Sequence, residues 1–171
     1  MATCPRLAVA FALVLLTALV SSSALAQSSV KRACADAYVN NQKLRKVGKL
    51  VAAKKQLQLC AEDRCPDVVK VDCGKWLEEV NKNLPTIVVA ARAAGQDVFG
   101  VTVRVDGQIV ATKLDGRPIA IDPGPHTLQI EGSDGKKVDK KVLIQQGVQN
   151  RSIVIELSPN KKPADSGATP P

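Results

Sequence analysis

Residues 101–109 read Val101-Thr102-Val103-Arg104-Val105-Asp106-Gly107-Gln108-Ile109, an alternation of apolar and polar side chains that ends in a sharp turn signal. A period of two is typical of a β-strand that has one buried face and one face in water. The Asp-Gly pair tolerates the positive φ angles that a two-residue hairpin turn requires. The stretch therefore predicts an antiparallel β-hairpin.

Similar short strands are predicted on both sides of this hairpin. They are separated by turn signals such as Asp115-Gly116, Pro123-Gly124 and Gln146-Gly147. About seven strands at this spacing favour a small antiparallel β-sandwich over residues 85–158. The expected strands are 86–91, 101–106, 109–113, 118–121, 126–131, 137–144 and 152–157. The polar, proline-containing segment 159–171 cannot bury enough apolar surface to fold and is predicted to be a disordered tail.

The sequence before Pro85 has a helical period instead. A first helix should end near Gly48, a second should end at Glu62-Asp63-Arg64, and a third should open at Cys65-Pro66-Asp67. Proline suits the first turn of a helix, and aspartate suits its positive end. The expected fold class is therefore α+β, with a disulfide-stapled three-helix bundle over residues 27–84 followed by the sandwich.

Four cysteines lie in the helical segment, at Cys34, Cys60, Cys65 and Cys73. They allow three pairings. If the helices run antiparallel with level ends, the distance of each cysteine from one end of the bundle follows from a rise of about 1.5 Å per residue. Matching these distances favours the pairs Cys34–Cys73 and Cys60–Cys65. Cys34 with Cys60 remains an alternative. A zinc site would require pairs spaced Cys-x₂₋₄-Cys, so disulfides are the preferred interpretation.

Residues 1–26 have the features of a secretory leader: Arg6, an apolar run over 7–20, and Ala24-Leu25-Ala26 at the end. Cleavage is predicted after Ala26, and an uncleaved anchor is the alternative. Cys4 precedes the apolar run and would leave with the leader. The mature protein is expected to be periplasmic or secreted, without a stable membrane span, in a compartment where disulfides persist.

The positive charge is concentrated in the helical part. Residues 27–84 contain 12 basic and 7 acidic residues, whereas residues 85–158 contain 9 and 8. Lys43, Arg45, Lys46 and Lys49 form a candidate basic interaction face at the open end of the first helical hairpin, with a solvated helix face as the alternative. The expected partner is an envelope protein or an acidic surface polymer. With one Trp, one Tyr and two Phe, the chain has too few aromatic residues to stack nucleic-acid bases.

Residues suited to catalysis are scarce. His126 is the only histidine, and no nucleophile motif lies near it, so we predict no catalytic, cofactor-binding or metal-binding residues. Asp106, Asp115 and Asp122 each belong to a turn and form no Asp-x-Asp ligand run. Trp76 is predicted to pack on the third helix.

The first two helices resemble a tetratricopeptide-type helical hairpin. Its small and large packing positions correspond to Gly48 at the turn and then to Leu50, Ala53, Leu57 and Cys60, with Leu44 before the turn. The usual aromatic residue of the first helix is missing, and Asn41 stands where a small residue is normal. The resemblance covers about one and a half repeats.

The segment 100–132 resembles the PEGA domain and its carboxypeptidase-regulatory-like relatives. The resemblance rests on the strand ending in Asp106-Gly107 and on the later turn Pro123-Gly124-Pro125-His126, and Leu114-Asp115-Gly116-Arg117-Pro118 replaces the usual Gly-x-Thr-Pro. It implies a non-enzymatic exported binding or scaffold module of the bacterial cell envelope. The alternative is an accessory or regulatory subunit of an envelope signalling or transport complex that binds a partner peptide through the helical hairpin. An enzyme of another type is a third hypothesis.

Overall fold

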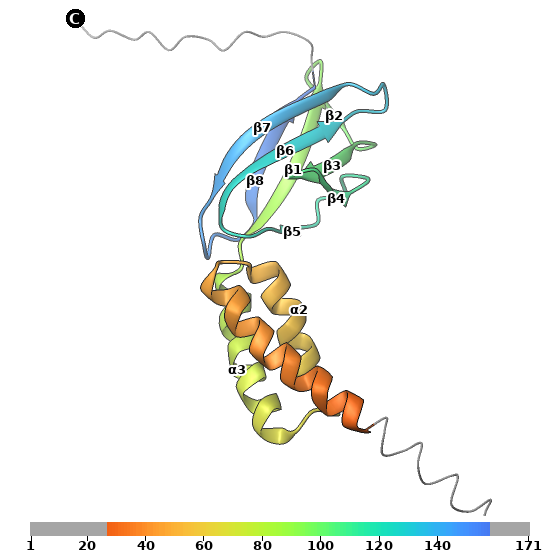
Figure 1. Ribbon diagram of the computed structural model, residues 1–171. Helices are drawn as coiled ribbons and strands as arrows, with labels where there is room; N and C mark the ends of the chain where they lie inside the picture. The colour runs from red at the N-terminus through yellow and green to blue at the C-terminus, as the bar shows by residue number, and fades with distance from the viewer. Residues whose placement is uncertain (1–26, 158–171) are drawn as a thin grey trace, which may run out of the picture. The chain divides into compact units, whose positions relative to one another are not determined.

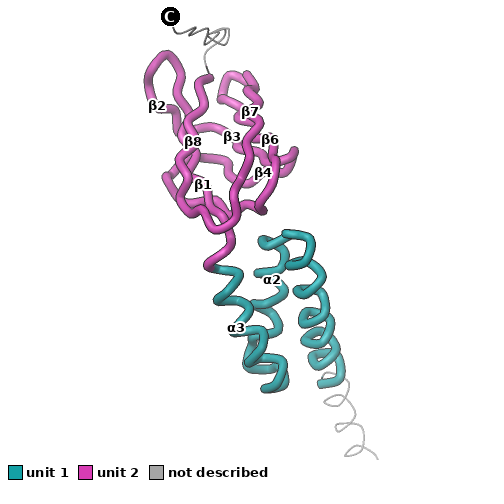
Figure 2. The backbone as a smooth tube through the Cα atoms, turned by 90° about the vertical axis from the view of Figure 1, so that its left-hand side faces the viewer, with its two compact units in different colours: residues 1–81 teal, residues 82–171 magenta. Residues whose placement is uncertain are grey.

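The computed structural model describes residues 27–157, so the expected leader and tail lie outside the described residues. Contacts between Cα atoms divide the chain into two compact units, Met1–Asn81 and Lys82–Pro171 (Figure 2). The first unit is helical and the second consists of β-sheets (Figure 1). The α+β fold class predicted from the sequence is therefore confirmed.

The first unit contains the helix of residues 27–46, α2 (Leu50–Cys60) and most of α3 (Asp67–Asn83). Gly48 ends the first helix with a φ of 72°. Its N–H donates to the carbonyl of Arg45 at 3.1 Å, and the N–H of Lys49 donates to the carbonyl of Leu44 at 2.9 Å. These bonds satisfy carbonyls that the end of a helix leaves unpaired, which is why a glycine at this position reverses the chain.

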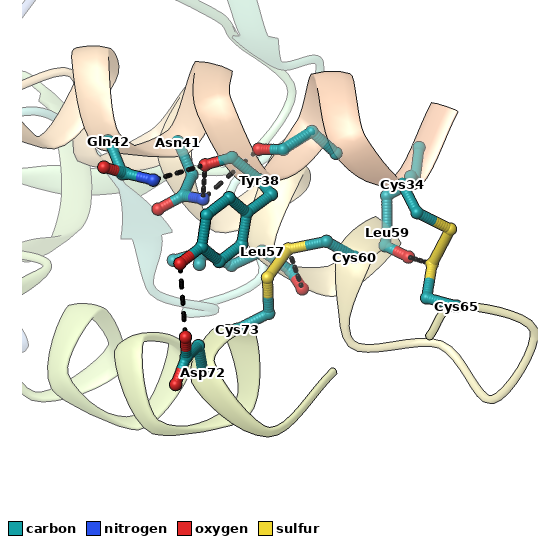
Figure 3. Close-up of a disulfide and its surroundings, with 11 residues drawn as sticks. Cys34, Tyr38, Asn41, Gln42, Leu57, Leu59, Cys60, Cys65, Asp72 and Cys73 are labelled. Carbon is teal, nitrogen blue, oxygen red and sulfur yellow. Dashed lines mark hydrogen bonds between the residues drawn. A yellow bond between two sulfur atoms is a disulfide. The ribbon is translucent and has the colours of Figure 1, made fainter. Parts of the chain in front are cut away.

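The disulfide pairing differs from the prediction. Cys34 bonds to Cys65 with Cα atoms 5.7 Å apart, and Cys60 bonds to Cys73 with Cα atoms 5.9 Å apart (Figure 3). The predicted pairs Cys34–Cys73 and Cys60–Cys65 are wrong, and so is the alternative Cys34–Cys60.

The error lies in the assumption that the helix ends are level. Cys60 is the last residue of α2, whereas Cys73 is six residues into α3, about 9 Å from its start. Because these two residues are bonded, α3 must begin beyond the end of α2. Cys65 lies in the loop that connects the end of α2 to the start of α3, farther toward this end of the bundle than Cys60. The first helix starts at residue 27 and extends far enough to place Cys34 beside Cys65 in that loop.

One sheet of the second unit is built around β1 (Thr86–Ala93). β1 pairs antiparallel with β2 (Gln96–Val98) and β5 (Ile119–Ala120), and parallel with β8 (Arg151–Glu156). β2 was absent from the sequence prediction, and the parallel β1–β8 pair departs from the expected all-antiparallel arrangement. The hairpin between β1 and β2 turns at Ala94 and Gly95, both of which have positive φ.

The other sheet has the order β4-β3-β6-β7, with every neighbouring pair antiparallel. Its strands are β3 (Thr102–Val105), β4 (Gln108–Ala111), β6 (Gly124–Glu131) and β7 (Lys137–Ile144). The β3–β4 connection is the predicted Asp106-Gly107 turn, with φ angles of 49° and 84°.

The two sheets share one apolar core. Its buried members are mainly β-branched, as expected for side chains that stand on a pleated surface. They are Ile87, Val89, Ala91, Val101, Val103, Ile121, Leu128, Ile130, Ile144, Ile153 and Ile155. On one side of the sandwich, Lys140 Nζ donates to the carbonyl of Val154 at 2.9 Å, and Arg151 donates to the carbonyl of Leu143. These two side chains cover backbone acceptors on β8 and β7, which protects the strand edges.

Candidate binding surface

The four predicted basic residues lie at the end of the bundle opposite the disulfides. Lys43, Arg45 and Lys46 are on the last turns of the first helix, and Lys49 immediately precedes α2. The three lysines are exposed, whereas Arg45 is half-buried. The structure therefore separates Arg45 from the other three.

Arg45 is held by α3. Its guanidinium forms an ion pair with Glu79 at 2.5 Å and lies over the ring of Trp76, 5.2 Å from the ring centroid. A guanidinium at this distance from an indole face makes a favourable cation–π contact. Arg45 thus joins the first helix to α3, and its side chain is already engaged in contacts within the bundle.

Trp76 also contacts Tyr38, with the ring centroids 5.2 Å apart and the planes tilted by 37°. The Tyr38 hydroxyl donates to Asp72 at 3.2 Å (Figure 3). Partial burial raises the pKa of Tyr38, and the hydrogen bond and negative charge of Asp72 raise it further. Trp76 therefore packs between two helices, which agrees with its predicted packing role.

These contacts form a continuous row that the sequence reasoning missed. Asp72, Trp76 and Glu79 are spaced four and three residues apart, so they share one face of α3. Tyr38 and Arg45 are seven residues apart and share one face of the first helix. The helical spacing within each of these two sets was the sequence signal that could have predicted the contact between the first helix and α3. It shows which side of the hairpin α3 covers.

Asn41, three residues after Tyr38 on the first helix, is fully buried. Its amide nitrogen donates to the carbonyls of Ala37 at 3.2 Å and Tyr38 at 2.6 Å (Figure 3). Its Oδ1 atom has no hydrogen-bond partner among the described residues. A buried acceptor without a partner destabilises a bundle.

His126 connects two turns of the sandwich. Its Nδ1 lies 2.7 Å from Asp106 Oδ2, and its Nε2 lies 2.9 Å from the backbone carbonyl oxygen of Asp122. Asp106 Oδ1 also accepts the N–H of Thr127 at 2.9 Å. These contacts anchor the β3–β4 turn to the start of β6, which is a structural arrangement.

Asp115 likewise organises a turn. It accepts hydrogen bonds from the Arg117 side chain at 2.8 Å and from the Arg117 backbone N–H at 3.2 Å. These bonds, with the side-chain bond the larger contribution, lower the pKa of the Asp115 carboxyl. In residues 27–157, no group of three His, Cys, Asp or Glu side chains is arranged to hold a metal ion.

None of the helices in the described part of the chain is both long and apolar enough to cross a membrane. The predicted leader lies outside that part. Comparisons with known proteins found no family model that matches the chain and no matching curated protein.

Proposed function

We propose that the protein is an exported, non-enzymatic binding or scaffold module of the bacterial cell envelope. The leader-like segment 1–26 would direct export. A tetratricopeptide-like hairpin and a PEGA-like sandwich would make up the mature protein. Both resemblances rest on the sequence motifs, and the observed helical hairpin and β-sandwich are compatible with them.

The observation that carries this proposal is the state of the cysteines. Cys34, Cys60, Cys65 and Cys73 are all joined in disulfides, and each is buried. Such bonds persist in oxidising compartments and are rare in the reducing cytosol. The disulfides therefore indicate an oxidising, extracytoplasmic environment, and export through a cleaved leader would provide the route to it.

The basic end of the bundle, which we define as Lys43, Lys46 and Lys49, is the proposed contact surface. Its three lysines are exposed residues at one end of the unit, two on the last turns of the first helix and one just before α2. Such a group of cations attracts an acidic envelope protein or an acidic surface polymer through charge. Arg45 is left out because its side chain is half-buried against α3, beside Glu79 and Trp76.

The proposal is tested by reversing the three charges together, as Lys43→Glu, Lys46→Glu and Lys49→Glu, in the full chain. The matched control reverses Lys31, Lys55 and Lys75, which are also exposed lysines of the helical unit, so the change in net charge is identical. Retention in the envelope fraction is measured across a salt series. Salt should weaken retention of the unmodified protein, because exposed charges are screened over about 8 Å at physiological ionic strength.

The basic-end variant should lose most of its retention, whereas the control and His126→Ala should keep it. Retention that ignores both salt and the basic-end reversal would contradict the proposed surface. Equal losses of retention in the basic-end and control variants would show that retention depends on overall net charge and not on the basic end. N-terminal sequencing of the mature protein should begin at Gln27, and an intact Met1 on a cytoplasmic protein would contradict export.

A further inference from the structure

Residues 37–61 contain six basic residues and no aspartate or glutamate. This range covers the second half of the first helix, the turn at Gly48 and all of α2. The acidic residues that flank it are Asp36 and Glu62. Elsewhere in residues 27–157, no stretch without an acidic residue is as long. The helical hairpin therefore carries positive charge that its own sequence does not neutralise.

α3 neutralises only part of this charge. Asp72 accepts a hydrogen bond from the Tyr38 hydroxyl. Glu79 forms its ion pair with Arg45. Successive residues of a helix are about 100° apart, so the exposed Glu78 lies off the face that Glu79 presents to the hairpin. The carboxylates that α3 directs at the first helix are thus engaged by residues outside the basic end.

An exposed valine lies among the lysines of the basic end. Val47 is 69% exposed and stands in the turn, directly after Lys46 and two residues before Lys49. Lys43 is four residues before Val47, about one helical turn away. Lys43 and Lys46 make no ion pair within residues 27–157. The basic end therefore combines uncompensated cations with an apolar side chain, which gains free energy when a partner covers it.

This combination distinguishes between partners that charge alone does not. An acidic polymer offers carboxylates and hydroxyls, and these attract lysines but do not cover a valine. The surface of an anionic bilayer offers both contacts, because its headgroups attract lysines and apolar side chains enter the boundary with the acyl chains. Long lysine stems keep the ammonium groups among the headgroups while a shorter apolar side chain lies deeper.

We propose that the basic end binds the surface of an anionic phospholipid bilayer, with Val47 at the headgroup boundary and Lys43, Lys46 and Lys49 among the phosphates. This inference rests on the proposed function, because it names the partner of the same surface. The attachment is peripheral. A lysine near an anionic bilayer strengthens binding about fivefold, so the three lysines together contribute about a hundredfold.

The opposite end of the bundle offers a matched control. Val68, the second residue of α3, is 75% exposed. It follows Asp67, and the carboxylates of Asp67 and Asp63 both pair with Lys70. Val68 is therefore as exposed as Val47 but has acidic neighbours, which an anionic bilayer repels. It should remain in water.

Tryptophan fluorescence with lipid vesicles tests the proposal. The protein is the oxidised mature chain, residues 27–171, because an apolar leader would itself bind lipid. Val47→Trp and Val68→Trp each place an indole at an exposed valine, and Trp76, packed between two helices, is a constant background. With phosphatidylglycerol vesicles, the emission of Val47→Trp should shift to shorter wavelength and be quenched by brominated acyl chains. The emission of Val68→Trp should not change, and phosphatidylcholine vesicles should affect neither variant.

Sedimentation with the same vesicles measures the affinity without a reporter. Lys43→Gln, Lys46→Gln and Lys49→Gln together should weaken binding to phosphatidylglycerol about a hundredfold. Val47→Ser should weaken it about threefold or more, and Val68→Ser should leave it unchanged.

Two results would overturn the proposal. The first is no binding to phosphatidylglycerol vesicles at about 10 mM salt, where screening is weak. The second is equal quenching of the indoles at positions 47 and 68. If retention in the envelope fraction still depended on the basic end in either case, the proposed contact surface would stand and its partner would be an acidic protein or polymer. Loss of that dependence as well would remove the surface itself.

Discussion

The helical unit and the sandwich are stabilised by different means. Among the described residues of the helical unit, nine apolar residues are buried, and four of them are the disulfide-bonded cysteines. Leu50, Leu57 and Val80 are the larger aliphatic side chains, and two alanines complete the set. The sandwich buries eleven clustered apolar residues and has no disulfide within its described part. Covalent bonds thus substitute for apolar burial in the smaller core.

This difference follows from size and composition. A segment of about 55 residues buries a small fraction of its surface on folding, so apolar contacts alone give it only marginal stability. The helical unit also includes Asn41, whose buried Oδ1 has no described partner. Disulfides counteract both costs by restricting the unfolded chain. The sandwich needs no such restriction because Ile, Val and Leu side chains fill the space between its sheets.

The largest expected effect comes from removing the Cys60–Cys73 bond by Cys60→Ala with Cys73→Ala. We expect the helical unit to lose about 2–5 kcal/mol, because the bond closes a loop and both cysteines are fully buried. Denaturant unfolding followed by far-UV circular dichroism measures the helical transition. A helical midpoint equal to that of the unmodified protein would show that the bundle is stable without this bond.

A similar or somewhat smaller effect is expected from Leu128→Ala in the sandwich core. Leu128 is fully buried on β6, and truncating a buried leucine leaves a cavity that costs about 2–5 kcal/mol. The loss should appear in the sandwich transition, with the helical transition unchanged. Leu143→Ala provides the control, because this side chain on β7 is 63% exposed and should change stability by about 0.5 kcal/mol or less. Equal effects of the two substitutions would contradict the assigned core.

The smallest expected effect is the pH dependence of the Asp115 turn. Its folded-state pKa lies below the unfolded value because Arg117 binds the carboxylate. The resulting stabilisation is therefore present above the unfolded pKa, about 3.9, and is lost as the pH falls through the folded pKa. Thermal unfolding of the sandwich at a series of acidic pH values should show this loss. Asp115→Asn and Arg117→Gln should both reduce the slope, and an unchanged slope would contradict the cause.

The sequence was sufficient for features that depend on local patterns. The period-two alternation around Val103, the Asp106-Gly107 turn and the stop at Gly48 all predicted structure that is present. Each depends on a few neighbouring residues, so no long-range information was needed.

Features that depend on distant contacts were missed. β2 has only three residues, and its strand identity comes from pairing with β1. The parallel β1–β8 pair joins residues about 64 positions apart, which no local period encodes. The disulfide pairing required the relative heights of the helices, and these depend on how the loop around Cys65 is folded. The role of Arg45 became visible only when α3 placed Glu79 and Trp76 beside it.

Hydrogen exchange of the full chain, measured residue by residue with the disulfides intact and after their reduction, tests the central claim most directly. The claim is that covalent bonds stabilise the helical unit, whereas apolar burial stabilises the sandwich. Reduction should greatly accelerate exchange in the first helix, α2 and α3 up to Asn81, and leave protected amides of β3 and β6 unchanged, because stability varies between cooperative units of a chain. Protection that persists in α2 after complete reduction, or that is lost equally in both units, would contradict the account.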